Sequence, residues 1–379
     1  MVTNRFRTSR GTCILILLLG FISVAARQLP AQSPQSPPDP VLTQRPAEPA
    51  AKTASVIAPE GRIHLDVTVT DAAGKPVTGL EPWDFKLLDE NQPRKILSFR
   101  SYDGVLVKPE PPVEVSLLID TANLPFQQVA YVRSEIRRFL VENGGHLSQP
   151  VSLFLLTDTG LRVQPQPSLD GNALLAVLDR VKANVQTITS AASGDGMVER
   201  FQLSIRGLTH IAEYEEKRPG KKLLIWIGPG WPLLNSTIFQ FTEKDQRRYF
   251  DSIVQLSTKL REGRMVLYSV APADVTSPGT YNFVYQNFLK GVRTAHQADT
   301  GNLALKVLSV ETGGRILGPD NNLTGQIESC IAEANAFYTI SFNPPPAERA
   351  DEYHDLKVRL SNPALTARTS SGYYNQPAN

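Results

Sequence analysis

The sequence predicts an α/β protein with a doubly wound, mostly parallel sheet and helices on both of its faces, joined to a smaller β unit. Two observations predict this architecture. Between residues 112 and 342, short apolar segments of strand type alternate with longer segments whose apolar residues recur at helical spacing. Before and after this region, at residues 63–70 and 356–360, apolar and polar residues alternate one by one, which is typical of half-buried strands.

The composition is that of an ordinary globular protein. The chain has 379 residues, of which 41% are hydrophobic and 20% charged, and its net charge is +2. This length is enough for two or three domains. A net charge so close to zero gives no strong overall field, so nucleic acid is not expected as a partner.

The first 26 residues have the pattern of a signal peptide. A basic stretch, an apolar run and a small-residue cleavage site follow one another: Arg5, Arg7 and Arg10, then residues 13–22, then Val24, Ala25 and Ala26. The apolar run is shorter than the roughly 20 residues that a membrane span needs. We therefore expect an exported protein, periplasmic or extracellular, with no transmembrane span in the mature chain.

The two cysteines of the chain are Cys13 and Cys330. Cys13 lies inside the expected signal peptide, so the mature chain would keep one thiol and could form no internal disulfide. Cys330 lies on an apolar helical stripe, where a buried and inert thiol is expected.

Three regions outside the α/β domain complete the expected organisation. Residues 27–59 are rich in Pro, Ala, Gln and Ser and predict an extended linker, either a spacer that holds the protein away from a surface or a plain disordered leader. Residues 60–108 predict a small β domain, and residues 343–379 a β tail. Because each has too few strands to bury a face alone, we expect the tail to pack on the small β domain.

Within residues 112–342 the alternation is regular. The expected strands are 113–119, 151–156, 222–227, 265–270, 315–317 and 337–342. The expected helices are 129–140, 174–181, 201–212, 242–263, 303–308 and 327–334. Strands that alternate with helices in this way predict a mostly parallel sheet.

Three blocks of sequence carry a resemblance to a known family. They are residues 63–99, the strand VSLLIDTAN that contains Asp120, and the tail segments FYTISFNPPP, EYHDLKVRL and SGYY. Together they resemble the von Willebrand factor A (VWA)-related proteins of the acidobacterial type. The resemblance implies a VWA-like, Rossmann-like fold, with a β-sandwich-like unit formed by the two ends of the chain.

The resemblance also implies a cation site, and this chain departs from it. In VWA domains a D-x-S-x-S loop after the first strand, with oxygen ligands from later loops, holds a divalent cation. Here Asp120 matches the aspartate, but Ala122 and Leu124 stand at the serine positions. Where an acidic residue is expected after Ile227, the chain reads Gly-Pro-Gly-Trp. We therefore expect a degenerate site without a bound metal.

No pattern in the sequence predicts catalysis or a cofactor. The histidines at positions 64, 146, 210, 296 and 354 are far apart and are expected in surface or turn positions. There is no G-x-S-x-G elbow, and the glycines after Ile227 match neither a dinucleotide nor a P-loop motif. The chain is therefore not expected to be an enzyme.

A partner-binding surface is expected where loops leave the carboxyl ends of the parallel strands. We assign Asp120, Thr121, Asn123 and Trp231 to it, with aromatic residues of the loops 231–241 and 271–299 beside them. The alternative for Trp231 is that it covers a helix end. The predicted function is an exported protein-interaction or adhesion-type module whose partner is a protein or another polymer. The alternative is a metal-dependent (Mg²⁺ or Ca²⁺) adhesion domain, and an enzyme is the least supported reading.

Overall fold

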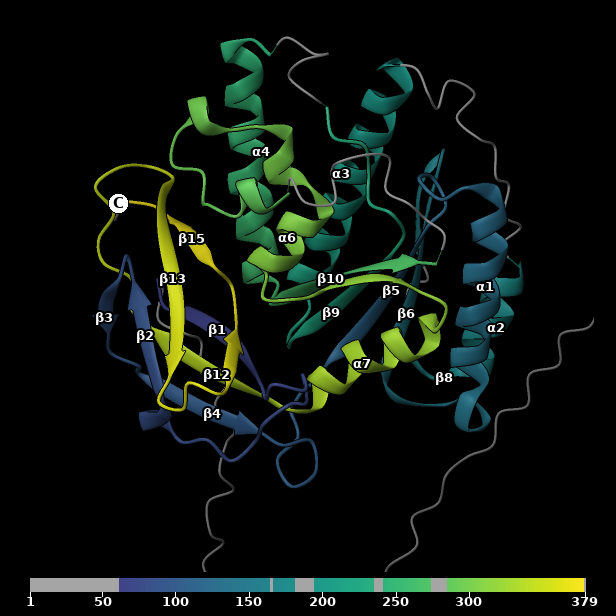
Figure 1. The fold of residues 1–379 in the computed structure, drawn as a ribbon, viewed down its shortest axis with the longest axis horizontal. Helices are drawn as coiled ribbons and strands as arrows, with labels where there is room; N and C mark the ends of the chain where they lie inside the picture. The colour runs from purple at the N-terminus through teal and green to yellow at the C-terminus, as the bar shows by residue number, and fades with distance from the viewer. Residues whose placement is uncertain (1–60, 164–165, 181–193, 235–240, 274–284, 378–379) are drawn as a thin grey trace, which may run out of the picture. The chain divides into compact units, whose positions relative to one another are not determined.

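The computed structural model describes residues 61–163, 166–180, 194–234, 241–273 and 285–377. The expected signal peptide, the expected linker and residues 274–284 of the long loop 271–299 lie outside the described residues, as does Phe239. The described residues contain one mostly parallel sheet flanked by helices and two antiparallel sheets (Figure 1).

The central sheet is built from strands whose apolar runs are buried on both faces. Its strands are β5 (Glu114–Asp120), β6 (His146–Thr157), β7 (Gly160–Val163), β8 (Ser168–Asp170), β9 (Lys222–Ile227), β10 (Met265–Pro272) and β11 (Ile316–Asp320). The order across the sheet is β11-β10-β9-β5-β6-β7, and β8 also pairs with β6. All neighbours are parallel except the β6 pairs with β7 and β8. When the six strands of this path are numbered along the chain and read from β7 to β11, the order is 3-2-1-4-5-6, which is a doubly wound order.

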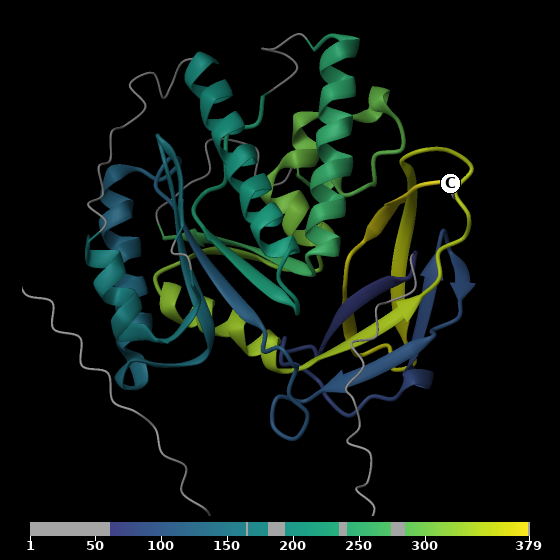
Figure 2. The same cartoon turned by 180° about the vertical axis from the view of Figure 1, so that it is seen from behind.

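Helices cover both faces of this sheet (Figures 1 and 2). They are α1 (Phe126–Val141), α2 (Gly171–Arg180), α3 (Gly194–Glu216), α4 (Glu243–Glu262), α6 (Leu305–Glu311) and α7 (Leu323–Asn335). Short 3-10 turns lie at Pro82–Asp84, Glu142–Gly145, Tyr285–Phe288, Ala295–Gln297 and Thr300–Leu303. Helices α1, α2 and α7 share one apolar core with the sheet, and α3, α4 and α6 share the other.

Local sequence fixes the helix ends. Helix α4 begins after Thr242, whose hydroxyl accepts a hydrogen bond from the backbone N–H of Asp245, while the Asp245 carboxylate accepts one from the Thr242 N–H. This reciprocal pair satisfies two backbone donors at the start of the helix. The helix ends at Gly263. The sequence predicted both ends within a residue.

The two antiparallel sheets contain the ends of the described chain. One has the order β14-β1-β12-β4 and the other β15-β13-β2-β3. Their strands are β1 (Ile63–Thr70), β2 (Phe85–Asp89), β3 (Gln92–Arg94), β4 (Ser98–Tyr102), β12 (Phe337–Phe342), β13 (Glu352–Leu360), β14 (Thr366–Arg368) and β15 (Gly372–Asn375). Apolar residues of both sheets form one shared core, so the unit is a β-sandwich.

Chain ends that are far apart in sequence therefore lie side by side, because β1 pairs with β12 and β2 pairs with β13. One boundary differs from expectation. Strand β12 was assigned to the α/β domain but pairs with β1 and β4 of the sandwich. The reason is that α7 ends at Asn335 and leads directly into β12, so the chain crosses between the two units there.

Candidate functional site

The loop face is the side of the α/β domain where loops leave the carboxyl ends of the parallel strands. Ligand sites of doubly wound folds form there. Strand β5 is central, with β6 on one side and β9 on the other. The chain goes first to β6 and then crosses back through α3 to β9, so loops diverge from the carboxyl ends of β5 and β9 and leave a crevice. Asp120 ends β5, and Gly228 follows β9 at the same edge.

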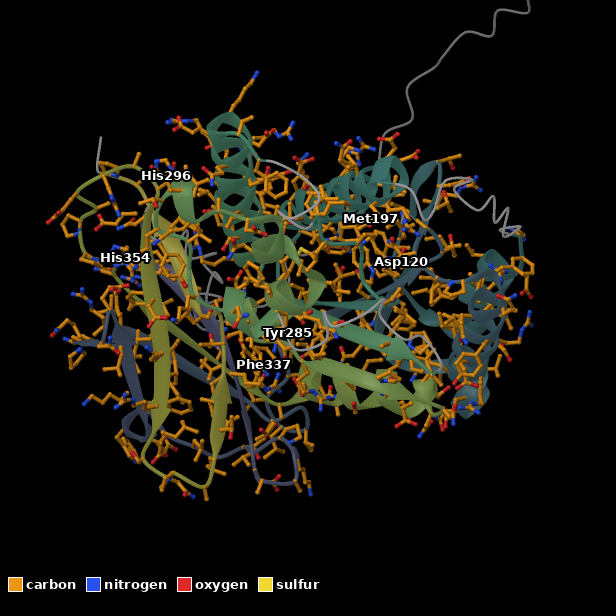
Figure 3. The ribbon with its side chains drawn as sticks, turned by 45° about the horizontal axis from the view of Figure 1, so that its top comes forward. Asp120, Met197, Tyr285, His296, Phe337 and His354 are labelled. Atoms are coloured by element: carbon orange, nitrogen blue, oxygen red, sulfur yellow. The ribbon has the colours of Figure 1, made fainter. Side chains whose placement is uncertain are left out.

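Asp120 points toward the α3 face of the sheet. Side chains alternate along a strand, so Asp120 shares a face with Leu118, which belongs to the core beneath α3. The side chain is completely buried. Gly228 lies so close that a Cβ there would be 2.8 Å from the Asp120 Cβ. Figure 3 places Asp120 within the α/β domain, well apart from His354 in the sandwich.

Neutral donors occupy both oxygens of the Asp120 carboxylate. The Trp226 indole N–H donates to Oδ2 at 2.9 Å. The Asn123 amide Nδ2 lies 3.0 Å from Oδ1 and from Oδ2, and the Asn123 backbone N–H donates to Oδ1 at 3.1 Å. The groups that donate hydrogen bonds to the carboxylate are thus all neutral.

The rest of the loop is fixed by neighbouring elements. The Asn123 amide also donates to the Ser204 hydroxyl of α3 at 3.0 Å. The Thr121 hydroxyl donates to the carbonyl of Leu156 at the end of β6, at 2.7 Å. These contacts tie the β5 loop to α3 on one side and to β6 on the other.

Burial raises the pKa of the Asp120 carboxyl to about 6, although the hydrogen bonds from Trp226 and Asn123 lower it. The charge of Asp120 also acts on Arg200 of α3, but burial is the larger effect there and lowers the pKa of the guanidinium. A carboxyl with a pKa near 6 in a water-free position changes its charge just below neutral pH.

Trp231 is buried rather than presented at the surface, with 7% of the residue exposed. Its ring packs edge-on against Trp226, with 5.1 Å between the ring centroids, and its indole N–H donates to the carbonyl of Leu303 at 3.1 Å. The loop from Gly228 to Trp231 begins as a continuation of the sheet, because the Gly228 N–H donates to the Val270 carbonyl. Trp231 therefore covers the core on the α3 side and fixes the loop position.

A groove opens beside this loop, between α3 and α4. Its volume is about 670 Å³. Its walls combine aromatic and aliphatic side chains with charged ones: Val198, Phe201, Gln202, Ile205, Arg206, Leu234, Phe241, Asp245, Arg248, Tyr249, Ser252 and Leu303. Such a mixture of apolar walls and few charges is typical of a binding site.

The donor set does not fit a bound cation well. Within the described parts of the chain, no group of three or more His, Cys, Asp or Glu side chains could hold a metal ion. Ala122 and Leu124 offer no side-chain oxygen, and both Asp120 oxygens already accept hydrogen bonds. The one side-chain oxygen of this loop that makes no hydrogen bond is Asn123 Oδ1, which is buried.

The structure thus brings Asp120 and Asn123 into contact, turns Thr121 toward β6, and connects Trp231 to them through Trp226. Sequence reasoning missed Trp226 and Ser204. Ser204 gave a signal, since it is a polar residue on the otherwise apolar stripe of Phe201 and Leu208. Trp226 gave a weaker one, as the single aromatic residue of β9.

One histidine differs from expectation. His354 was expected in a surface or turn position, but it is 6% exposed and its Nδ1 lies 2.9 Å from Asp89 Oδ1. Its ring also stacks on Tyr373, with 4.9 Å between centroids. The alternation of β13 places it inside the sandwich.

No family model matches the chain, and no curated protein matches it by sequence. Solved structures similar to it include the human COPII-coat protein Sec24c, with a TM-score of 0.34 and 8% identity over 70% of this chain and 44% of that one. Others are the pilus adhesin SpaC from Lactobacillus rhamnosus GG (TM-score 0.37, 10% identity, 78% and 48% covered) and the PilB minor pilin from Streptococcus sanguinis (0.34, 12%, 59% and 62%).

The chain spans about half the length of these three structures, from 44% to 62%. Likenesses this remote carry no information on what the chain binds. None of the helices in the described ranges combines the length and the apolar character needed to cross a bilayer.

Proposed function

We propose that this chain is an exported, non-catalytic binding module of the VWA type, whose partner contacts the loop face of the α/β domain. The observation that carries the proposal is the state of Asp120. A residue at the position of a cation ligand is buried, bonded to Trp226 and Asn123, and used to hold loops together. The loop architecture of a ligand site is present while the ligands of a cation are replaced.

The partner surface combines the β5 loop with the groove between α3 and α4. Thr121 and Asn123 are half-buried and can meet a partner at the rim, whereas Asp120 and Trp231 support the loops from below. Arg206 and Arg248 line the groove beside Phe201 and Tyr249. These side chains suit a protein segment with an apolar side chain and an acidic neighbour.

Photo-crosslinking in the exporting cells tests this surface. A benzophenone amino acid at Gln202 or at Ser252, both in the groove, should yield one discrete adduct. The matched control is Gln92, an exposed residue of β3 in the sandwich. Addition of Arg206→Glu and Arg248→Glu should remove the adduct without lowering the melting temperature. Equal crosslinking from all three positions, or none from the groove, would refute a partner at this site.

A metal-dependent adhesion domain remains the second candidate, because the unpartnered Asn123 Oδ1 lies beside Asp120. A cation that binds the native state stabilises it, by about 2.7 kcal/mol at a concentration one hundred times its dissociation constant. We expect no rise in melting temperature when EDTA-treated protein is titrated with Mg²⁺, Mn²⁺ or Ca²⁺. A rise that Asp120→Ala abolishes would favour the metal-dependent alternative.

A further inference from the structure

An exposed apolar turn joins the two units of the protein on the side opposite the loop face. It follows β4 and comprises Val105, Leu106 and Val107, which are 78%, 87% and 46% exposed. Three consecutive aliphatic residues in water are unfavourable, so a surface of this kind marks an interaction site when its shape is fixed.

The shape of this turn is fixed by its own hydrogen bonds. The Asp103 carboxylate Oδ1 accepts from the backbone N–H groups of Val105, Leu106 and Val107, at 3.0, 2.8 and 2.8 Å. These bonds hold the pKa of the Asp103 carboxyl below its usual range. Gly104 has a positive φ of 74° and packs so closely on Asn335 that a Cβ would lie 2.7 Å from the Asn335 carbonyl oxygen. The apolar side chains are therefore presented by a preorganised turn.

A groove lies directly beside the turn, and Asn335 belongs to both. The groove has a volume of about 510 Å³ and lies between the end of α1, the start of β6 and α7. Its apolar lining residues are Phe139, Leu147, Val151, Ile331 and Ala332. Asn335 is fixed there by a hydrogen bond of 2.6 Å from Gln149. Figures 1 and 2 show the turn as the closed loop between β4 and β5, near the junction of α7 and β12.

Charges on the turn and on the groove are opposite. Glu142 and Glu328 line the groove, and burial together with the Glu142 side chain raises the pKa of Glu328. The Arg138 guanidinium, which lowers this pKa, is engaged by Glu135 at 2.6 Å. Lys108 follows the apolar turn directly and is exposed. In the described part of the chain neither Lys108 nor this carboxylate pair has an ion-pair partner.

We propose that the turn of one copy of this chain inserts into the groove of a second copy, with Val105 to Val107 on the apolar floor and Lys108 against Glu142 and Glu328. Turn and groove lie on one face and share Asn335, so a two-fold axis lets both insertions form at once in a closed dimer. The lysine relieves the repulsion between two neighbouring carboxylates by placing a positive charge against them. The interface leaves the loop face free for its own partner.

Charge reversal tests the pairing, because only two copies of this chain can exchange the charges. Sedimentation velocity on the purified exported chain should show a monomer–dimer equilibrium with a dissociation constant below about 100 µM. Lys108→Glu or Glu328→Lys should raise this dissociation constant about tenfold or more. An equal mixture of these two variants should dimerise again, since each mixed interface regains opposite charges. The double variant should also self-associate.

Leu106→Asp should abolish the dimer, whereas Val163→Asp, at an exposed apolar residue of β7, should not. Leu106 is 87% exposed, so its replacement leaves the core intact, and an unchanged melting temperature at a concentration where the wild type is monomeric verifies this. A chain that is monomeric at about 100 µM, a dimer insensitive to Leu106→Asp, or charge reversals that are not rescued by mixing would each overturn the proposal.

Discussion

Two buried aspartates at opposite edges of the central sheet are stabilised in opposite ways. Asp66 of β1 meets the amino end of β10, where the Arg264 guanidinium contacts both of its oxygens, at 3.1 and 2.5 Å, and Thr339 adds a hydrogen bond. Burial opposes the charge of Asp66, but Arg264, Lys221 and Thr339 together outweigh burial and the pKa is lowered. Asp120 has neutral donors in place of a cation, and its pKa is raised to about 6.

The difference distinguishes two kinds of site. Asp66 lies at the contact between the sandwich and the α/β domain, here called the joint, and Asp120 lies at the loop face, where we propose that a partner binds. The Asp66–Arg264 pair joins the sandwich to the α/β domain, and Glu333 of α7 similarly forms ion pairs with Arg315 and with Arg368 of the sandwich, at 2.8 and 2.7 Å. These ion pairs connect the sandwich directly to the α/β domain. At the loop face, burial of the charged Asp120 carboxylate costs more than its neutral hydrogen bonds recover, and protonation at lower pH removes this cost.

The largest effect is expected at the joint. Arg264→Met leaves Asp66 buried without its cation and should lower the free energy of unfolding by about 3–5 kcal/mol. The matched control is Arg137→Met, because Arg137 and Asp179 form an ion pair with side chains 51% and 44% exposed. Its loss should be below about 1 kcal/mol. Urea unfolding measures both.

Addition of Asp66→Asn to Arg264→Met should recover part of the loss, since the unpaired charge is then removed. Equal losses in the Arg264 and Arg137 variants would show that the Asp66 pair is not a joint, and the contrast between the two edges of the sheet would fail.

The second effect is the pH dependence of Asp120. Its pKa in the folded state is about 6 against 3.8 for an ordinary aspartate, so the folded state binds a proton more tightly. The contribution of this residue to stability therefore increases as the pH falls from about 6 toward 4, by on the order of 3 kcal/mol in total. Asp66 has a lowered pKa, and its contribution is lost only when the pH falls below 3.8.

The measurement compares unfolding free energies of the wild type and Asp120→Asn between pH 4 and pH 7. Contributions of other groups cancel in the difference, including Glu311, whose pKa burial raises to about 8. The Trp226 indole N–H resonance should titrate with a midpoint near pH 6 in the wild type alone. A wild type and a variant with the same pH profile would show that Asp120 has an ordinary pKa.

The third effect tests how tightly the loop after β9 is packed on Asp120. Gly228→Ala places a Cβ 2.8 Å from the Asp120 Cβ, and neither backbone can move freely within the sheet edge. We expect a loss of about 1–3 kcal/mol. Gly318→Ala is the control, because no atom lies within 4 Å of the position its Cβ would take, and its effect should stay within about 0.5 kcal/mol. Similar values for both would contradict the close packing of the two loops.

The fold followed from the sequence more fully than the site did. Periodicity is a local property, so strands such as β9 and helices such as α4 could be predicted with nearly correct ends. The mostly parallel sheet follows from their alternation. The position of β12 could not be predicted in this way, because its apolar run is equally suited to the interior of either unit.

The site depended on contacts between distant residues. Asp120 was assigned to the loop face from its position at the end of β5, but its partner Trp226 lies 106 positions further along the chain, and Ser204, the partner of Asn123, lies 81 positions beyond Asn123. No short pattern connects them. The burial of Trp231 was open for the same reason, since an aromatic residue after a strand serves a surface and a core equally well.

The smallest effect is expected for Ser204→Ala. The variant removes the hydroxyl that accepts from the Asn123 amide, but that amide keeps both oxygens of Asp120 as acceptors. The loss should be about 1 kcal/mol. Ser252→Ala, on α4, removes a hydroxyl bonded only to its own helix and should stay within about 0.5 kcal/mol. Asp120 is held by several neutral donors, so its surroundings tolerate the loss of one contact, whereas Asp66 depends on Arg264. A Ser204→Ala loss as large as that of Arg264→Met would remove this distinction.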